Sequence, residues 1–231
     1  FGSLEIDPQY VMHLAVGTSF SIIIPTSLVS VYTHNKHGAV DPKIIKSYAL
    51  FVIIGVIFGT YFASILKTKG LILFFTIVVY VLSIYLLFLK EKSQDAEPNF
   101  KMLPKIVFGF ISGFVSAPMG IGGAVMNVPI LKYFGYPINK AIGSAAAIGF
   151  VIALFGAGGF LISGSYLNAN LPLSIGFINI PALLIFIPIT TFMAKVGANA
   201  VHRIEKAKIT KLFGLFLIVV GSIFLYRYLN I

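Results

Sequence analysis

The chain contains no cysteine and no tryptophan, and only 10% of its 231 residues are charged. The lack of cysteine excludes a disulfide framework, thiolate metal ligands and a cysteine nucleophile. Soluble domains carry about 25% charged residues, so this composition excludes an ordinary soluble domain. Acidic residues are fewer than basic ones, 7 against 17, and none lies inside a long apolar segment. A carboxylate proton relay, which many pumps use, is therefore not expected.

Hydrophobic residues make up 58% of the chain, and the mean hydropathy is +0.98. Seven apolar segments are each long enough to cross roughly 30 Å of hydrocarbon. They cover residues 11–32, 47–66, 70–89, 105–134, 139–163, 173–196 and 211–229. The sequence therefore predicts an all-α polytopic transmembrane helical bundle, multi-pass in the cell (plasma or inner) membrane.

The net charge is +10, but the lysines and arginines fall almost entirely between the apolar segments. This pattern is typical of anchoring at the membrane surface, so the expected partner is the lipid bilayer and not nucleic acid. If every apolar segment crosses once, the basic residues divide almost evenly between the two sides. The orientation in the membrane cannot be derived from this division. The sequence also leaves a homo-oligomer open.

The segment 105–134 breaks the rules for a membrane helix. Pro118 removes a backbone donor, and Gly120, Gly122 and Gly123 leave the following backbone unconstrained. We predict two half-helices, 105–117 and 123–134, joined by an unwound turn. Irregular backbone at membrane depth is tolerated only inside protein or beside a watery cavity, and broken helices mark transporter binding sites.

The second half-helix would present its first amides, and the positive end of its dipole, to the turn. Successive glycine amides can then form a nest for an anion. The candidate substrate-binding residues are Gly120, Gly122, Gly123, Asn127, Ser144, Thr18, Ser19 and Ser116. The alternative is that the glycines only allow close helix packing, as in Gly109-x-x-x-Gly113, and that the hydroxyls bond to their own helices.

His13 is an ionisable group inside an apolar segment, and it could couple transport to protons. More often such a residue is a hydrogen-bonded or interfacial histidine. Sodium is the alternative coupling ion. His34 and His37 with Asp41 have a metal-like spacing but lack a further ligand, so no metal and no cofactor is expected. Ser144 has no histidine base in the following apolar segments, so an enzyme is not predicted.

Two motifs repeat at a constant offset of 126 residues. They read Tyr10-x-x-x-x-Ala15-Val-Gly17-Thr18 and Tyr136-x-x-x-x-Ala141-Ile-Gly143-Ser144. We predict a first repeat at 1–90 with three transmembrane helices, a polar linker at 91–104, and a second repeat at 105–231 with four. These would be two related four-helix halves, with the first helix of the first half missing. If the broken helix crosses the membrane once, the two halves have the same orientation. If it re-enters on the same side, the number of crossings changes and so does the relation between the halves.

A longer pattern resembles the sulfite exporter TauE/SafE family. It comprises Gly113-x-x-Ser116-x-x-x-Gly120-x-Gly122-Gly123-x-x-x-x-x-Pro129, then Gly135 and Ala141-x-Gly143-Ser144, with Ala15-Val-Gly17-Thr18-Ser19 earlier. The chain departs from the family pattern at Ala117-Pro118 and Ala124, which replace positions that are often glycine or another small residue in the family. The resemblance implies two four-helix halves and a secondary transporter of a small sulfur-containing or organic anion, such as sulfite or sulfoacetate. The alternatives are an anion channel on the same scaffold and a non-transporting membrane interaction subunit.

Overall fold

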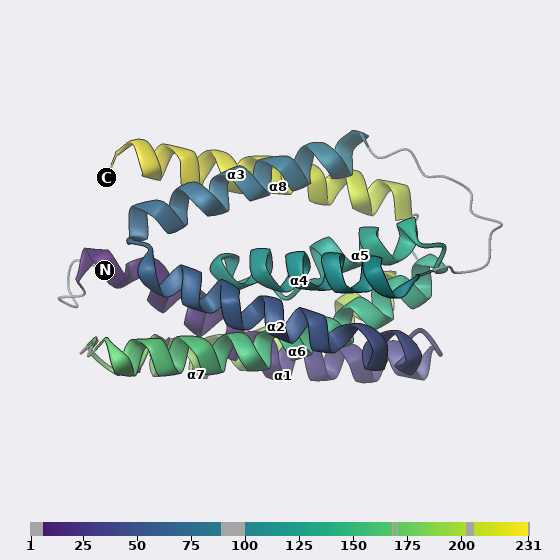
Figure 1. Ribbon diagram of the computed structural model, residues 1–231, viewed down its shortest axis with the longest axis horizontal. Coiled ribbons are helices and arrows are strands. Elements are labelled where there is room, and N and C mark those ends of the chain that lie inside the picture. The colour runs from purple at the N-terminus through teal and green to yellow at the C-terminus, as the bar shows by residue number, and fades with distance from the viewer. Residues whose placement is uncertain (1–6, 89–99, 168, 170, 202–205, 231) are drawn as a thin grey trace.

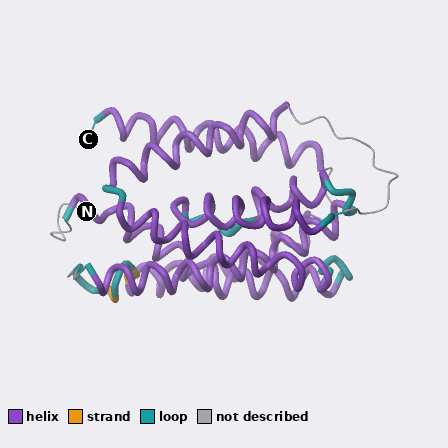
Figure 2. The backbone as a smooth tube through the Cα atoms, in the orientation of Figure 1, coloured by secondary structure: helices purple, strands orange, loops and turns teal. Residues whose placement is uncertain are grey.

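The computed structural model describes residues 7–88, 100–167, 169, 171–201 and 206–230. Within these ranges the chain forms a bundle of long helices whose axes run roughly side by side (Figures 1 and 2). The elements are a 3-10 turn Pro8–Tyr10, α1 (Val11–Lys36), α2 (Pro42–Ile65), α3 (Thr68–Phe88), α4 (Met102–Met119), α5 (Ala124–Tyr133), α6 (Ile138–Tyr166), β1 (Ser174–Ile175), β2 (Ile178–Asn179), α7 (Ile180–Val201) and α8 (Lys206–Leu229).

The prediction of an all-α, multi-pass bundle is confirmed. Seven helices are long and apolar enough to cross a membrane, namely α1 with the turn before it, α2, α3, α4, α6, α7 and α8. The predicted linker 91–104 lies mostly outside the described residues, and α4 begins at Met102.

One predicted boundary was wrong. The apolar segment 173–196 does not begin as a helix, because Ser174–Ile175 pairs antiparallel with Ile178–Asn179. Gly176 has a φ of +55°, which a tight two-residue hairpin turn requires and which glycine adopts without steric cost. The membrane helix therefore starts only at Ile180.

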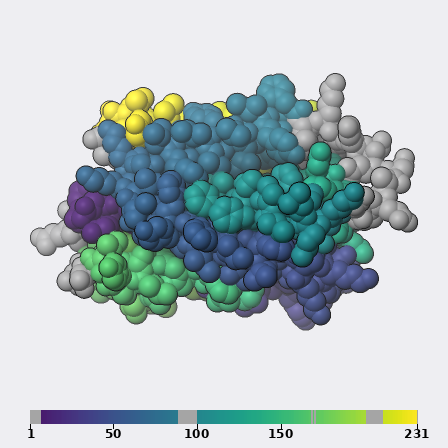
Figure 3. All heavy atoms as spheres, in the orientation of Figure 1, coloured from purple at the N-terminus to yellow at the C-terminus, as the bar shows by residue number. Residues whose placement is uncertain are grey.

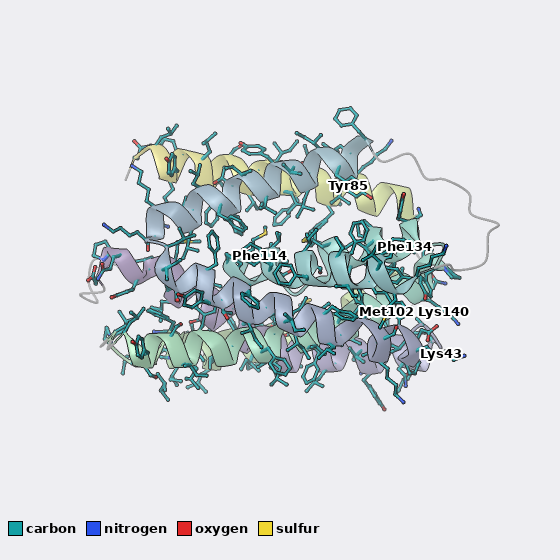
Figure 4. All side chains as sticks on the ribbon, viewed as in Figure 1. Lys43, Tyr85, Met102, Phe114, Phe134 and Lys140 are labelled. Carbon is teal, nitrogen blue, oxygen red and sulfur yellow. The ribbon has the colours of Figure 1, made fainter. Side chains whose placement is uncertain are left out.

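The chain turns back on itself between α4 and α5. The Phe134 ring, just after α5, stacks 4.2 Å from Phe100 and lies 5.6 Å from Phe108, both near the start of α4. Figure 4 shows Phe134 close to Met102, whereas Phe114 lies deeper along the bundle. The two half-helices therefore form a re-entrant hairpin that enters and leaves at one end. We call this the linker end, and the opposite end, which holds the N- and C-termini, the termini end (Figure 1).

Because the hairpin does not cross, α6 and α8 run opposite to α1 and α3, the helices beside which they pack. Side-chain contacts give the directions directly. Ser83 of α3 bonds to Gly214 of α8, while Phe75 packs 4.4 Å from Phe224, so α3 and α8 are antiparallel. A Cβ on Gly143 would collide with Ala39, which follows α1, so the start of α6 lies beside the end of α1. These two helices, which carry the repeated motifs, are therefore also antiparallel.

Two equivalent hydrogen bonds join the first part of the bundle to the second. The Thr18 hydroxyl of α1 accepts from the backbone N–H of Asn179 at 2.9 Å, and the Ser144 hydroxyl of α6 accepts from that of Asp41 at 3.0 Å. Asp41 and Asn179 each stand directly before a helix, α2 and α7 respectively. Residues at the same position in the two motifs thus hold the start of a helix in the other part.

Helices α2 and α4 pack backbone to backbone. A Cβ added to Gly113 would collide with the Val52 carbonyl oxygen, and one added to Gly55 with that of Phe110. In the space-filling view the α4 surface lies directly against α2 (Figure 3). The glycine pattern predicted to favour close packing does so here, because small residues let membrane helices approach closely.

Replacing Gly113 should disrupt this contact selectively. We expect Gly113→Ala to lower the free energy of unfolding by about 1–3 kcal/mol, because backbone atoms cannot move aside for the methyl group. Gly158→Ala is the matched control, since a Cβ there meets no atom within 4 Å. It should leave stability unchanged or raise it by up to about 1 kcal/mol. Melting temperatures in detergent would test the pair, and equal shifts would contradict the packing assignment.

Candidate functional site

The break between α4 and α5 is built by two glycines in left-handed conformations. Gly120 ends α4 with a φ of 65°, and Gly123 precedes α5 with a φ of 49°. Residues other than glycine are strained at such φ angles. The predicted half-helices are confirmed, with the first extended to Met119 so that Pro118 lies in its last turn.

The break lies about midway along α1. A Cβ at Gly120 would approach Val16 at 3.2 Å, and one at Gly122 would approach Ile23 at 3.1 Å, while α1 runs from Val11 to Lys36. The Ser19 hydroxyl donates to the Gly120 carbonyl at 2.8 Å. Irregular backbone is therefore enclosed at mid-depth by protein, as membrane burial demands.

Only part of the predicted glycine nest is free. The Gly120 amide donates to Ala117 and the Gly123 amide donates to Ile121 at 2.8 Å, so both are used within the turn. The Ala124 amide bonds to the Gly122 carbonyl. In the described part of the chain, the amides that lack an acceptor here are those of Ile121, Gly122, Val125 and Met126.

This corrects the predicted donor set. The positive end of α5 is presented by the amides of Val125 and Met126, and the turn adds the unpaired amides of Ile121 and Gly122, so the donors are not those of all three glycines. The N-cap residue of α5 is Gly123, which has no side chain, and no side chain of the described residues caps the helix. Uncapped amides at a helix N-terminus carry partial positive charge and suit an anion.

Asn127 positions the turn and does not line it as a free donor. It is fully buried, and its Oδ1 accepts from the Tyr48 hydroxyl at 3.0 Å and from the Ser112 hydroxyl at 2.9 Å. Its Nδ2 donates to the Gly123 carbonyl at 2.7 Å. One side chain therefore fastens α5 and the turn to both α2 and α4.

The predicted hydroxyls have different surroundings. Ser116 is 2% exposed, stands one turn before Gly120, and makes no side-chain hydrogen bond to the described residues. Ser19 is committed to the turn, as described above. Thr18 and Ser144 bond to backbone amides outside their own helices, which neither sequence interpretation anticipated. Of the predicted hydroxyls, that of Ser116 is therefore the one without a hydrogen-bond partner among the described residues.

His13 is enclosed apart from the break. It is 1% exposed, and its Nε2 donates to the Ala63 carbonyl at 3.0 Å, while Nδ1 has no hydrogen-bond partner among the described residues. The rings of Tyr10 and Phe177 pack around it. It stands six residues before Ser19, or roughly 9 Å along α1 toward the termini end.

Two residues near the break escaped sequence reasoning. Tyr48 begins a long apolar segment, and only its hydroxyl hinted at a buried polar partner. Gly149 of α6 lies so close to the turn that a Cβ there would come within 2.7 Å of the Gly122 carbonyl oxygen. Nothing in the sequence distinguishes Gly149 from the many other small residues of α6.

A polytopic helical bundle with a glycine-broken helix at mid-depth is the architecture of a membrane transporter. A sequence profile of the family described as sulfite exporter TauE/SafE matches residues 4–224. The chain belongs to this family, and the resemblance found in the sequence is confirmed.

Relatives of the chain are described as probable membrane transporter proteins. The chain is 31% identical over 220 residues to a probable membrane transporter protein of Haemophilus influenzae, with 94% of this chain and 83% of the relative covered. It is 30% identical over 196 residues to one of Methanocaldococcus jannaschii, covering 83% and 71%. It is 26% identical over 246 residues to the probable membrane transporter protein YunE of Bacillus subtilis, covering 96% and 83%. No solved structure matches.

The Asn127 network predicts an ordered series of stabilities. Asn127→Ala leaves the buried Tyr48 and Ser112 hydroxyls without their acceptor. Each unpaired hydroxyl should lower the free energy of unfolding by about 1–3 kcal/mol. Tyr48→Phe removes one hydroxyl but leaves Oδ1 bonded to Ser112, and should cost only about 0.5–1.5 kcal/mol. Thermal unfolding in detergent would compare the two variants. A Tyr48→Phe loss as large as that of Asn127→Ala would contradict this arrangement.

Proposed function

We propose that this protein is a secondary transporter that moves a small anion past the turn between α4 and α5. The observation that carries the proposal is the set of unpaired amides of Gly122, Val125 and Met126 at mid-depth. Amides in such surroundings need an acceptor, because no bulk water replaces one inside a bilayer. A passing oxyanion would supply it.

The residues around the turn favour a weakly held anion. Neighbouring side chains come from Val16, Ser19, Ile23 and Ile152, and none of them is charged. Attraction then rests on amide dipoles, which bind an oxyanion through several N–H groups without a fixed cation. Binding that is favourable but not strong allows release on the other side. Sulfite and sulfoacetate, or a small carboxylate, meet this description, and the family to which the chain belongs is described as sulfite exporters.

An inverted duplication would support alternating access. The motif-bearing helices α1 and α6 are antiparallel, and the Thr18–Asn179 and Ser144–Asp41 bonds are equivalent. Inverted repeats with a site at their interface are a common transporter design, in which one half rocks against the other. The halves would thus be inverted rather than parallel, the second of the two arrangements left open by the sequence.

The same relation gives α7 a specific role as the counterpart of α2. Gly197 lies 18 residues after Asn179, just as Gly59 lies 18 residues after Asp41. Gly59 is pressed against the backbone of Phe114 in α4, whereas a Cβ at Gly197 would meet no described atom within 4 Å. Among the described residues, the face of α7 that carries Gly197 is therefore uncovered, whereas the corresponding face of α2 is covered by α4.

Transport would be tested by uptake of radiolabelled sulfite, sulfoacetate and acetate into proteoliposomes. Gly122→Ala is the informative variant, because the added methyl group stands beside the unpaired Gly122 amide itself and meets only the flexible Ile23 side chain within 4 Å. We expect saturable uptake that falls at least about tenfold in this variant, with an almost unchanged melting temperature. Gly158→Ala serves again as the control and should transport normally.

Other outcomes distinguish the alternatives. Flux that follows the anion gradient without saturation would favour a channel. Absence of uptake of every anion by well-folded protein, with Gly122→Ala affecting only stability, would favour a non-transporting interaction subunit. Normal uptake in Gly122→Ala would remove the amide site from the mechanism.

His13 allows a direct test of proton coupling. Gln at this position can still donate to the Ala63 carbonyl, but it cannot titrate. Because His13 is enclosed and stands apart from the turn, we expect His13→Gln to retain uptake and its response to an imposed proton gradient. Loss of that response, with uptake by counterflow preserved, would instead assign the coupling proton to His13.

A further inference from the structure

The re-entrant hairpin decides on which side of the membrane each connection lies. Because α5 returns to the linker end, α6 starts there and α7 starts at the termini end. Contacts along α1 and α7 support this, since Thr26 bonds to Thr190 and His37 lies 3.4 Å from Asn199, so the two helices run parallel. The end of α7 and the start of α8 are therefore also at the linker end.

This path gathers the positive charge at one end. Within the described part of the chain, the basic residues at or near the linker end include Lys36, Lys43, Lys46, Lys101, Lys105, Lys132, Lys140, Lys195 and Lys211. Those at or near the termini end are Lys67, Lys69 and Arg227. Figure 4 shows Lys43, from the start of α2, and Lys140, from the start of α6, at the same end of the bundle.

The asymmetry follows from the hairpin and not from composition. Had the broken helix crossed once, all the basic residues after it would have changed sides, and the charge would have been divided almost evenly. Lys132 and Lys140 illustrate the difference, because the return of α5 places them beside the residues that flank α2. Basic connections between membrane helices are retained on the cytoplasmic side.

We propose that the linker end lies at the cytoplasmic surface, where its lysines face the anionic phospholipid headgroups, and that the termini end lies outside. Short connections make the rule applicable, since each described basic residue lies within a few turns of a helix end. The negative surface potential of the cytoplasmic leaflet attracts such clusters. The α4–α5 hairpin then enters the bilayer from the cytoplasm.

The absence of cysteine from the chain permits a clean topology test. Single cysteines would replace Asn35 and Asn139, which are exposed at the linker end, or Tyr166 and Ile175, which are exposed at the termini end. None of these changes alters the charge. Intact spheroplasts would be treated with a membrane-impermeant maleimide, before and after permeabilisation, with the cysteine-free parent as the blank.

We expect Tyr166→Cys and Ile175→Cys to be labelled in intact spheroplasts, and Asn35→Cys and Asn139→Cys at least about tenfold more after permeabilisation than before. The reverse pattern would overturn the proposed orientation. Equal labelling of all four positions in intact spheroplasts would overturn it as well, because it would mean that both orientations are inserted. Labelling of Asn35→Cys and Asn139→Cys on opposite sides would contradict the hairpin itself.

Discussion

The structure depends on the requirement that backbone polar groups inside a bilayer find partners within the protein. A chain that reverses at mid-depth exposes several such groups, and this protein meets the requirement with short-range bonds and one buried amide side chain. Asn127 holds the turn from three directions, to α2, to α4 and to the Gly123 carbonyl. Ser19 takes the Gly120 carbonyl. A few backbone N–H groups at the turn and at the start of α5 have no acceptor among the described residues, and they lie at the positive end of the α5 dipole.

The return of α5 also determines the relation between the two parts of the chain. A helix that crossed would have placed the two motif-bearing helices parallel, whereas a helix that returns places them antiparallel. The Thr18 and Ser144 bonds then fall at opposite ends of the bundle. One local event, two glycines with positive φ, thus sets the direction of α6, α7 and α8 and the end to which their connections belong.

Much of this was accessible from the sequence, for definite physical reasons. Length and hydropathy predicted the membrane helices, and Pro118 with the glycines that follow predicted the break. Whether the chain crosses or returns at the break was not accessible, because it depends on contacts such as Phe134 with Phe100, between residues far apart in sequence. The roles of Thr18 and Ser144 were missed for a similar reason, since a hydroxyl in an apolar helix does not reveal which distant amide it meets. The repeated motif did, however, mark both positions.

The two hydroxyl–amide bonds have a consequence for the alternating access proposed above, in which one half would rock against the other. The Thr18–Asn179 bond closes the bundle at the termini end, and the Ser144–Asp41 bond closes it at the linker end. Tilting one half to open one end would strain the bond there and leave the other as a pivot. Because the two bonds are chemically alike, the outward-open and inward-open forms would each sacrifice one equivalent interaction. In a carrier that works in this way, such a balance would keep the two conformations close in free energy, so that both could be visited.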